Sequence, residues 1–378
     1  MRNWKSKLAL AALLLPALSF AQTPTPADAL ALDQQQKWPE ATQAWRAITE
    51  RDPTDAAAFA ALGVDLAREQ KYDEAAVAYG RALKLNPRLP GVQLNLGLAE
   101  FKQGKFSGAA IALRAALAAD PKSAQARTLL GMSYYGARQF DLASQYLEPA
   151  AKADPANAEL HQMLAQSCLW AKKLACAQEE FALLLQQSPD SAPTHVLMGE
   201  ALDGLGKTPE AIAEFEAAAK ISPNAPNLHF GLGYLYWKSQ QYDLARQEFE
   251  RELALDPNHA QALAYLGDIN WKNNQPEGAL PLLQRAIKAD KDLRIAYLDI
   301  GAIYLQGKNY SDAKAALTQA VRLDPAQPDA HYQLGRLYQA QGKTADAERE
   351  LQKVQELHEK TDEGVGGKLP PSAATPKP

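Results

Sequence analysis

Prolines recur at a constant interval along most of this chain, and that interval constrains the fold more than any other feature of the sequence. Each of them closes a short apolar segment, as in ELALDP at 252–257. A proline cannot donate the backbone hydrogen bond that a continuing helix needs, and it moves the preceding residue out of the helical region. The period therefore predicts an array of helical units that each end at a proline. The prolines that keep the 34-residue interval are Pro53, Pro87, Pro121, Pro155, Pro189, Pro223, Pro257 and Pro325.

Each unit contains two stretches in which apolar residues recur every three or four positions. In the unit at 226–259, Leu232 and Tyr236 belong to the first stretch, and Phe249 and Leu253 belong to the second. This periodicity is typical of two amphipathic helices joined by a short turn. We therefore predict an all-α protein built from antiparallel helix pairs.

The period also divides the chain. We expect a signal peptide at 1–21, a degenerate first repeat at 22–55, nine full repeats at 56–361, and a disordered tail rich in Gly and Pro at 362–378. The tail lacks the apolar periodicity that a packed helix would need. Lys291 replaces the proline of the seventh full repeat, and we expect an irregular junction after it.

Small residues recur at two positions of the repeat. The eighth residue is glycine in every full repeat except one, which has Ala165, and the twentieth residue is alanine in all nine. A glycine inside a helix costs about 1 kcal/mol relative to alanine, so its recurrence requires a compensating gain. We expect the glycine of the first helix to face the alanine of the second, so that the two backbones approach closely.

The N-terminus has the order of a secretory signal peptide. Three basic residues precede an apolar run at 8–18, and small residues follow it up to Ala21. The run is about 11 residues long, whereas a membrane-spanning helix needs roughly 20. We expect export, cleavage near Ala21 and a mature chain without a transmembrane span, located in the periplasm or secreted. An uncleaved anchor is the less favoured alternative.

Charge argues against nucleic acid as a partner. Removal of Arg2, Lys5 and Lys7 with the signal peptide changes the formal net charge from −4 to −7. Binding to phosphates requires a positive surface, which an acidic chain of this kind lacks. The sequence also has no phosphate-binding glycine loop, nucleophile elbow or paired-histidine metalloprotease helix, and its turns never lengthen. We expect no enzymatic activity, no catalytic residues and no cofactor.

Histidines share the fourth position of several repeats, which raises the question of a metal site. Stacked helices lie roughly 8–10 Å apart, whereas the ligands of one zinc ion lie about 2 Å from the metal. We therefore expect these side chains to pack with one ring nitrogen hydrogen-bonded, and we predict no metal. The histidines at this position are His161, His195, His229 and His331.

The only two cysteines, Cys168 and Cys176, lie on the first and second helices of one repeat. An oxidising compartment favours a disulfide between them. The position of Cys168 should face the core, however, whereas that of Cys176 often faces outward. The pairing therefore stays open, and a bond here would be structural.

The repeat resembles the tetratricopeptide repeat, which has bulky residues at positions 4, 7 and 11, small residues at 8 and 20, an aromatic residue at 24, alanine at 27 and proline at 32. The resemblance implies a right-handed superhelical solenoid of antiparallel helix pairs. It also implies a scaffold that binds other proteins. In the repeat at 56–89 these positions hold Phe59, Leu62, Leu66, Gly63, Ala75, Tyr79, Ala82 and Pro87.

In this family, one surface of the first helices forms a concave groove that holds an extended peptide or a partner helix. Trp237 and Trp271 stand out among the corresponding residues because each is followed by lysine, and tryptophan is enriched among binding hot spots. The two cations could contact an acidic or C-terminal group. The competing interpretation is that these side chains pack neighbouring repeats together. The candidates are Leu98, Phe101, Tyr135, Trp170, Phe230, Tyr234, Trp237, Lys238, Trp271, Lys272, Tyr332 and Arg336.

Three functions follow from this surface. The favoured one is a non-enzymatic protein-binding scaffold of the cell envelope or the secreted space. An alternative is a polysaccharide-binding component of a polymer export or assembly machine, because aromatic rings also bind sugars. The least favoured is an enzyme that processes carbohydrate or cell wall.

Overall fold

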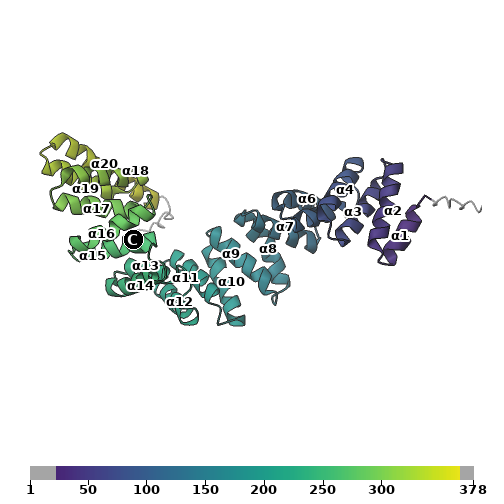
Figure 1. The fold of residues 1–378 in the computed structure, drawn as a ribbon, viewed down its shortest axis with the longest axis horizontal. Helices are drawn as coiled ribbons and strands as arrows, with labels where there is room; N and C mark the ends of the chain where they lie inside the picture. Colours follow the sequence, from purple (N-terminus) through teal and green to yellow (C-terminus); the bar gives the residue numbers. More distant parts are fainter. Residues whose placement is uncertain (1–22, 367–378) are drawn as a thin grey trace, which may run out of the picture. The chain divides into compact units, whose positions relative to one another are not determined.

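The computed structural model describes residues 23–366, and their side chains as far as residue 360, as helices joined by short turns (Figure 1). This part of the chain contains 20 α-helices and no strand, so the predicted all-α fold of helix pairs is confirmed. The predicted signal peptide and residues 367–378 of the predicted tail lie outside the described residues. Within the described range, no helix is both long and apolar enough to cross a membrane.

The chain divides into two units, with the division between Ser167 and Cys168, inside α9 (Ala158–Trp170). The helices of unit 1 that precede α9 are α1 (Pro26–Gln34), α2 (Trp38–Arg51), α3 (Ala56–Arg68), α4 (Tyr72–Leu85), α5 (Val92–Lys102), α6 (Phe106–Ala119), α7 (Ala124–Gly136) and α8 (Phe140–Ala153). Those of unit 2 that follow α9 are α10 (Leu174–Gln187), α11 (Ala192–Gly204), α12 (Thr208–Ile221), α13 (Leu228–Lys238), α14 (Tyr242–Leu255), α15 (Ala260–Lys272), α16 (Pro276–Ala289), α17 (Arg294–Gln306), α18 (Tyr310–Leu323), α19 (Pro328–Ala340) and α20 (Thr344–Gly366).

The second helix of a repeat ends where the sequence predicts. α14 ends at Leu255, and Asp256 has an extended backbone with φ −127° and ψ 94° before the proline. The Asp256 carboxylate then accepts a hydrogen bond from the backbone N–H of Asn258 at 3.0 Å. Such a turn satisfies a backbone donor outside the helix.

The junction at Lys291 is regular, contrary to our expectation. α16 ends at Ala289, and Asp290 is extended like its counterparts in other repeats. Its carboxylate accepts a hydrogen bond from the N–H of Asp292 at 2.9 Å. The acidic residue before the proline position therefore stops the helix even where the proline is missing.

The regular spacing of small residues is explained in part by a bulky side chain of the second helix, which the repeat pattern alone did not indicate. The glycine of the first helix lies against the bulky residue four positions after the alanine, and not mainly against the alanine itself. A Cβ atom added to Gly267 would lie 2.7 Å from Leu283, and one added to Gly233 would lie 2.8 Å from Phe249. The two backbones also approach closely as expected, because an added Cβ would lie 3.3 Å from the Ala245 carbonyl oxygen at Gly233 and 3.5 Å from the Ala279 carbonyl oxygen at Gly267. The glycine therefore makes room for a large side chain as well as for the backbone of the second helix.

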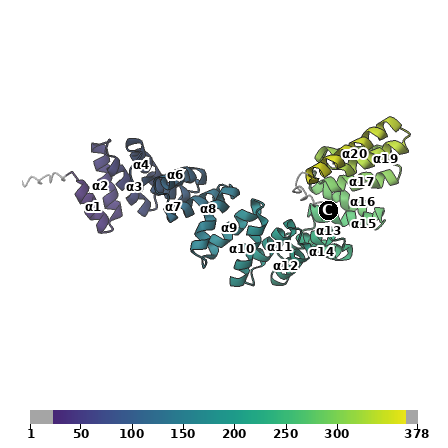
Figure 2. The same ribbon diagram turned by 180° about the vertical axis from the view of Figure 1, so that it is seen from behind.

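First helices of successive repeats lie side by side in unit 2. α13 contacts α15, α15 contacts α17, and α17 contacts α19. Figure 2 shows the same succession of pairs from the opposite side. This stacking places residues that are one repeat apart in the sequence on one continuous surface of the unit.

Candidate functional site

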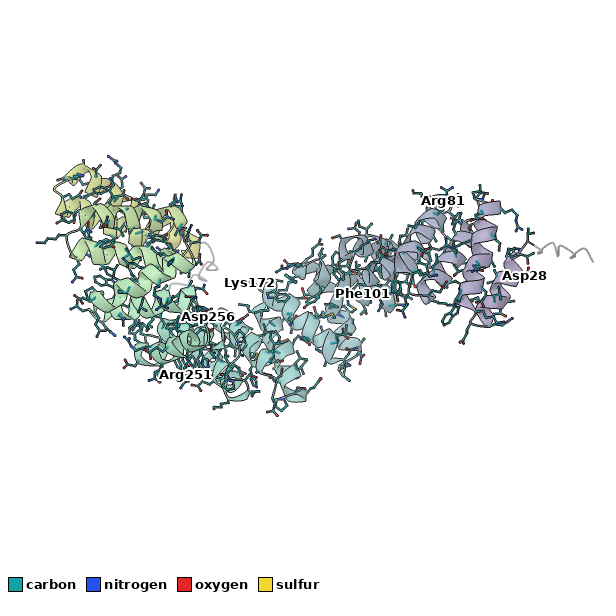
Figure 3. All side chains as sticks on the ribbon, viewed as in Figure 1. Asp28, Arg81, Phe101, Lys172, Arg251 and Asp256 are labelled. Carbon is teal, nitrogen blue, oxygen red and sulfur yellow. A yellow bond between two sulfur atoms is a disulfide. The ribbon has the colours of Figure 1, made fainter. Side chains whose placement is uncertain are left out.

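The structure distributes the predicted groove residues over both units. In unit 1, Leu98 and Phe101 lie on α5, and Tyr135 lies on α7. The Phe101 ring, labelled in Figure 3, packs edge-on against Phe106 with a centroid distance of 5.6 Å. The hydroxyl of Tyr135 is hydrogen-bonded to the side chain of Gln166. These side chains are half-buried and pack against neighbours within unit 1.

Unit 2 brings six of the candidates together along three hollows. A hollow of about 600 Å³ is lined by Phe230 and Tyr234. The next, of about 570 Å³, is lined by Tyr234, Trp237, Trp271 and Lys272, and we call it the acidic hollow because three aspartates also line it. A third hollow of about 510 Å³ shares Trp271 and Lys272 and adds Arg336. Shared lining residues make the three hollows one continuous path across α13, α15, α17 and α19.

Three candidates lie outside this path. Trp170, at the end of α9, has 45% of its surface exposed, and Tyr332 on α19 has 48% exposed. Lys238 extends from the end of α13, where its ammonium contacts the Asp203 carboxylate at 2.7 Å.

Aromatic rings form the wall between the first two hollows. One of them, Tyr265, was not among the residues predicted from the sequence. Tyr265 on α15 packs against Trp237 at a centroid distance of 4.8 Å and against Tyr234 at 5.5 Å. Its other neighbours are Phe249 at 5.7 Å and Phe230 at 6.1 Å. Tyr265 occupies the sixth position of its repeat, which was not among the predicted groove positions. Phe249 is fully buried, and we call the other four rings, which stay partly exposed, the aromatic surface.

A buried acid fixes the start of α13 beneath this surface. Glu252 is 2% exposed, and its carboxylate accepts hydrogen bonds from the backbone N–H groups of Asn227 at 3.1 Å and Phe230 at 3.0 Å. Asn227 has a left-handed backbone with φ 61°, so α13 begins two residues later in its repeat than α15 does. A carboxylate is favourable at a helix N-terminus. The signal for this role was glutamate at a position where most repeats have alanine.

Asp268 organises the acidic hollow. It is 3% exposed, and the indole N–H of Trp237 donates a hydrogen bond to its Oδ2 atom at 2.6 Å. The Lys272 ammonium lies 2.5 Å from both carboxylate oxygens and 5.0 Å from the centre of the Trp237 ring. The carboxylate and the ring therefore hold the lysine head group between them.

A second aspartate in this hollow forms no direct ion pair among the described residues, although the Lys272 and Arg294 cations act on it at longer range. Asp299 on α17 is 5% exposed, and its Oδ2 atom has no hydrogen-bond partner there. Burial raises the pKa of the Asp299 carboxyl well above its usual value, and the nearby Asp268 carboxylate adds to this shift. Like Tyr265, Asp299 occupies the sixth position of its repeat.

The third aspartate of the hollow is paired. Arg294 donates to both oxygens of Asp329 at 2.5 and 2.9 Å, and this interaction raises the pKa of the guanidinium. The sequence suggested that Lys238 and Lys272 could contact an acidic group of a partner. In the structure, both ammonium groups already contact carboxylates of the chain itself.

Each of three histidines at the fourth position of a repeat contacts a glutamate on the second helix of the same repeat. These contacts are His195–Glu214 at 2.5 Å, His229–Glu248 at 2.6 Å and His331–Glu350 at 2.7 Å. The other ring nitrogen of His195 and of His229 lies within 3 Å of the carbonyl oxygen of the preceding repeat's proline. His195 and His229 therefore join the two helices of a pair to the turn before them. Within residues 23–360, no group of His, Cys, Asp and Glu is arranged to hold a metal ion.

The two cysteines form a disulfide in the structure, with their Cα atoms 5.9 Å apart. Cys168 is buried and Cys176 is half-buried, so the second position does not point fully outward. The bond joins the end of α9 to α10.

Comparison with known proteins supports the repeat assignment. A tetratricopeptide repeat profile matches six segments, most of which overlap, and a second profile of the same description matches one more. The matched residues are 27–92, 61–124, 94–135, 128–192, 196–258, 230–294 and 304–364.

Solved structures resemble the chain in fold. The Cut9–Hcn1 hetero-tetramer of APC/C aligns with a TM-score of 0.51 and 14% identity, over 87% of this chain and 79% of that chain. YrrB, described as a TPR protein with an unusual peptide-binding site, has 23% identity and a TM-score of 0.39 over 48% of this chain and 93% of its own. MamA from Desulfovibrio magneticus RS-1 has 26% identity and a TM-score of 0.40 over 45% and 97%. No curated protein matches the sequence.

The repeat profiles cover well over half of the chain, and the helix pairs follow the 34-residue period of the sequence. The chain therefore belongs to the tetratricopeptide repeat family.

Proposed function

We propose that this chain is a non-enzymatic scaffold that binds an extended segment of another protein along the three hollows of unit 2. The tetratricopeptide fold suggests a protein–protein interaction scaffold. The observation that carries the proposal is the continuous path formed by hollows that share Tyr234, Trp271 and Lys272. An extended peptide crossing it would contact one repeat after another.

The chemistry of the path favours binding over packing alone. Phe230, Tyr234, Trp237, Tyr265 and Trp271 are all half-buried, so their faces stay partly accessible although their edges pack together. Half-exposed aromatic rings offer a large contact area with little further loss of side-chain freedom. Polar groups between the rings can fix the register of a bound backbone.

We also propose that the chain works outside the cytoplasm, in the periplasm or the secreted space. The predicted signal peptide supports this location. The Cys168–Cys176 disulfide supports it too, because disulfides persist mainly in oxidising compartments. N-terminal sequencing of the protein from fractionated cells tests the location, and a chain that begins at Met1 in the cytoplasm would contradict it.

The binding proposal is tested with an array of acetylated, amidated nonapeptides of random sequence, probed with the mature protein. The strongest binders are then titrated by fluorescence polarisation against Trp237→Ala plus Trp271→Ala. We expect at least a 30-fold loss of affinity, about 2 kcal/mol, because two central aromatic contacts disappear. Trp237→Phe plus Trp271→Phe keeps the rings and should retain most of the binding.

Two exposed leucines on second helices provide the matched control, Leu142→Ala plus Leu244→Ala, which should bind like the native protein. Thermal melting followed by circular dichroism checks that every variant folds. Equal peptide binding by the native protein and the folded Trp237→Ala plus Trp271→Ala variant would refute the proposal. Binding of an acidic or neutral glycan array without any peptide binding would favour the polysaccharide alternative.

A further inference from the structure

We propose that the acidic hollow binds a cationic side chain of the partner segment, arginine in particular, between the rings of the aromatic surface and the unpaired carboxylate oxygen of Asp299. This inference rests on the proposed function of the same path and names the chemistry of its ligand. The partner is therefore an extended protein segment that carries an exposed arginine.

The unsatisfied oxygen is the observation that points to a ligand. Asp299 lines the hollow, is 5% exposed, and has no hydrogen-bond partner at Oδ2 among the described residues. Leaving a buried acceptor without a partner is unfavourable, because the oxygen has lost its hydrogen bonds to water and gained none in return. A donor brought in by a ligand would recover this energy, and it would do so inside a hollow large enough, at about 570 Å³, to hold a side chain.

The charges in the hollow favour a cationic ligand group over an anionic one. The hollow contains three carboxylates and two cations, Lys272 and Arg294. Lys272 is held by Asp268, and Arg294 is held by Asp329 in a bidentate pair. Asp299 forms no direct ion pair with either cation among the described residues, although both act on it at longer range. A ligand cation in direct contact with Asp299 would therefore bring the charges of the hollow into balance, whereas an anion would not.

The rings of the hollow already accept a cation in this structure. The Lys272 ammonium lies 5.0 Å from the Trp237 ring centre, within the range of a cation–π contact. Lys272 thus shows which ligand group the aromatic surface accommodates. Tyr265 and Trp271 line the same hollow and offer further ring faces.

Arginine fits this arrangement better than lysine. A guanidinium is planar and stacks on aromatic rings while donating two parallel hydrogen bonds to a carboxylate. An ammonium is a compact point charge that is more strongly hydrated, so it loses more on entering a half-buried hollow. We expect arginine to be preferred over lysine and both over neutral residues.

Binding of a cation should also release a proton. The charged and titratable groups that act on Asp299 are Asp268 and Lys272 on α15, Arg294 on its own helix α17 and Asp329 on α19. In the empty hollow, burial and Asp268 favour the neutral form of the Asp299 carboxyl, since both raise its pKa. A guanidinium beside it favours the carboxylate, so affinity should rise with pH over the range in which Asp299 loses its proton.

The test uses the full mature protein and the nonapeptide that binds it best, compared with the same peptide in which citrulline replaces arginine. Citrulline keeps the shape and removes the charge. We expect citrulline to weaken binding at least tenfold. Asp299→Asn should weaken binding of the arginine peptide about tenfold and leave binding of the citrulline peptide unchanged. Asp243→Asn on α14 removes one exposed negative charge away from the hollow and should change neither affinity.

The outcomes separate this inference from the proposed function. Peptide binding that depends on Trp237 and Trp271 but shows no preference for arginine would refute the cation inference and leave the path as the binding site. The same conclusion follows if folded Asp299→Asn binds the arginine peptide like the native protein. Binding that does not depend on the two tryptophans would refute the proposed function itself.

Discussion

α5 in unit 1 and α13 in unit 2 are built alike and surrounded differently. Each is 11 residues long and begins after a left-handed residue, Gly91 at φ 75° or Asn227 at φ 61°. Beneath α13 the buried Glu252 accepts two backbone N–H groups, whereas the corresponding residue beneath α5 is Ala116. The repeat thus determines the backbone structure of both helices, and single residue differences determine which side chains surround each helix.

The surfaces of the two helices differ in the same way. α5 presents Leu98 and Phe101, and the ring packs against Phe106 within its own repeat. On α13, the Phe230 and Tyr234 rings pack against Tyr265 of α15. The Trp237 indole N–H donates a hydrogen bond to Asp268 of α15. The proposed binding path therefore consists of residues that the period leaves free to vary, and it lies in unit 2.

The framework itself should respond equally in both units. We predict that Gly301→Val in unit 2 and Gly131→Val in unit 1 each destabilise the protein by about 3 kcal/mol, because a side chain there overlaps the leucine of the second helix. An added Cβ would lie 2.5 Å from Leu317 in the first case and 2.9 Å from Leu147 in the second. Urea denaturation followed by circular dichroism measures the loss.

Gly80→Val is the control, since a Cβ at that glycine meets nothing within 4 Å. Its effect should stay within about 1 kcal/mol of zero or be stabilising. If one unit accepted valine at its close-approach glycine, the two frameworks would not be equivalent and the comparison between the units would fail.

We expect the Glu252 carboxylate to stabilise the first turn of α13. We predict that Glu252→Ala, which makes this place resemble the one beneath α5, costs about 2 kcal/mol, because two backbone N–H groups lose their acceptor. Hydrogen exchange at Asn227 and Phe230 should rise with it. Glu252→Gln keeps an acceptor and should lose less than half as much. Unchanged exchange in the alanine variant would show that the carboxylate does not hold α13.

Much of this fold was predictable from the sequence because the period, the helix stops and the small residues repeat. The site was predictable only in part. Trp237 and Trp271 belong to positions that the family uses for binding, whereas Tyr265 and Asp299 occupy a sixth position that turns toward the hollow in unit 2. The partner of the close-approach glycine was missed because spacing shows which residues recur and does not show which of them touch.

A buried aspartate in unit 1 offers a comparison with Asp299. Asp65 is 1% exposed, and burial raises the pKa of its carboxyl to about 6, although the Trp45 side chain donates to it. The folded state therefore favours the neutral acid, and it loses stability as the pH rises from about 4 to about 7. We predict that Asp65→Asn stabilises the protein by about 1–2 kcal/mol at pH 7.5, after allowance for solvent screening.

Thermal melting of the native protein and of Asp65→Asn at a series of pH values checks that the substitution is stabilising and that the effect depends on pH. The gain should shrink to near zero at about pH 3 or below, where the carboxyl of the native protein is mostly protonated in both the folded and the unfolded state. A gain of equal size at pH 4 and pH 7.5 would mean that the ionisation of Asp65 is not its cause.

Lys272 gives the smallest predicted effect, and a gain of function. We predict that Lys272→Met tightens binding of the arginine nonapeptide about fivefold, close to 1 kcal/mol, because the internal cation no longer competes for Asp268 and the Trp237 ring. Lys288→Met, on the exposed side of α16, removes the same charge elsewhere and should change affinity less than twofold. Fluorescence polarisation of the labelled peptide measures both, and weaker binding by Lys272→Met would show that the lysine assists the ligand instead of competing with it.

The most direct test of the account is calorimetric titration of the arginine nonapeptide in buffers of different ionisation enthalpy, from pH 5 to pH 8. The dependence of the measured heat on the buffer gives the number of protons released on binding. The account predicts that the native protein releases protons on binding, because contact with the guanidinium favours the ionised Asp299, and that the release falls to near zero for Asp299→Asn. Tight binding without proton release at any pH, or an equal release from the Asn variant, would contradict it.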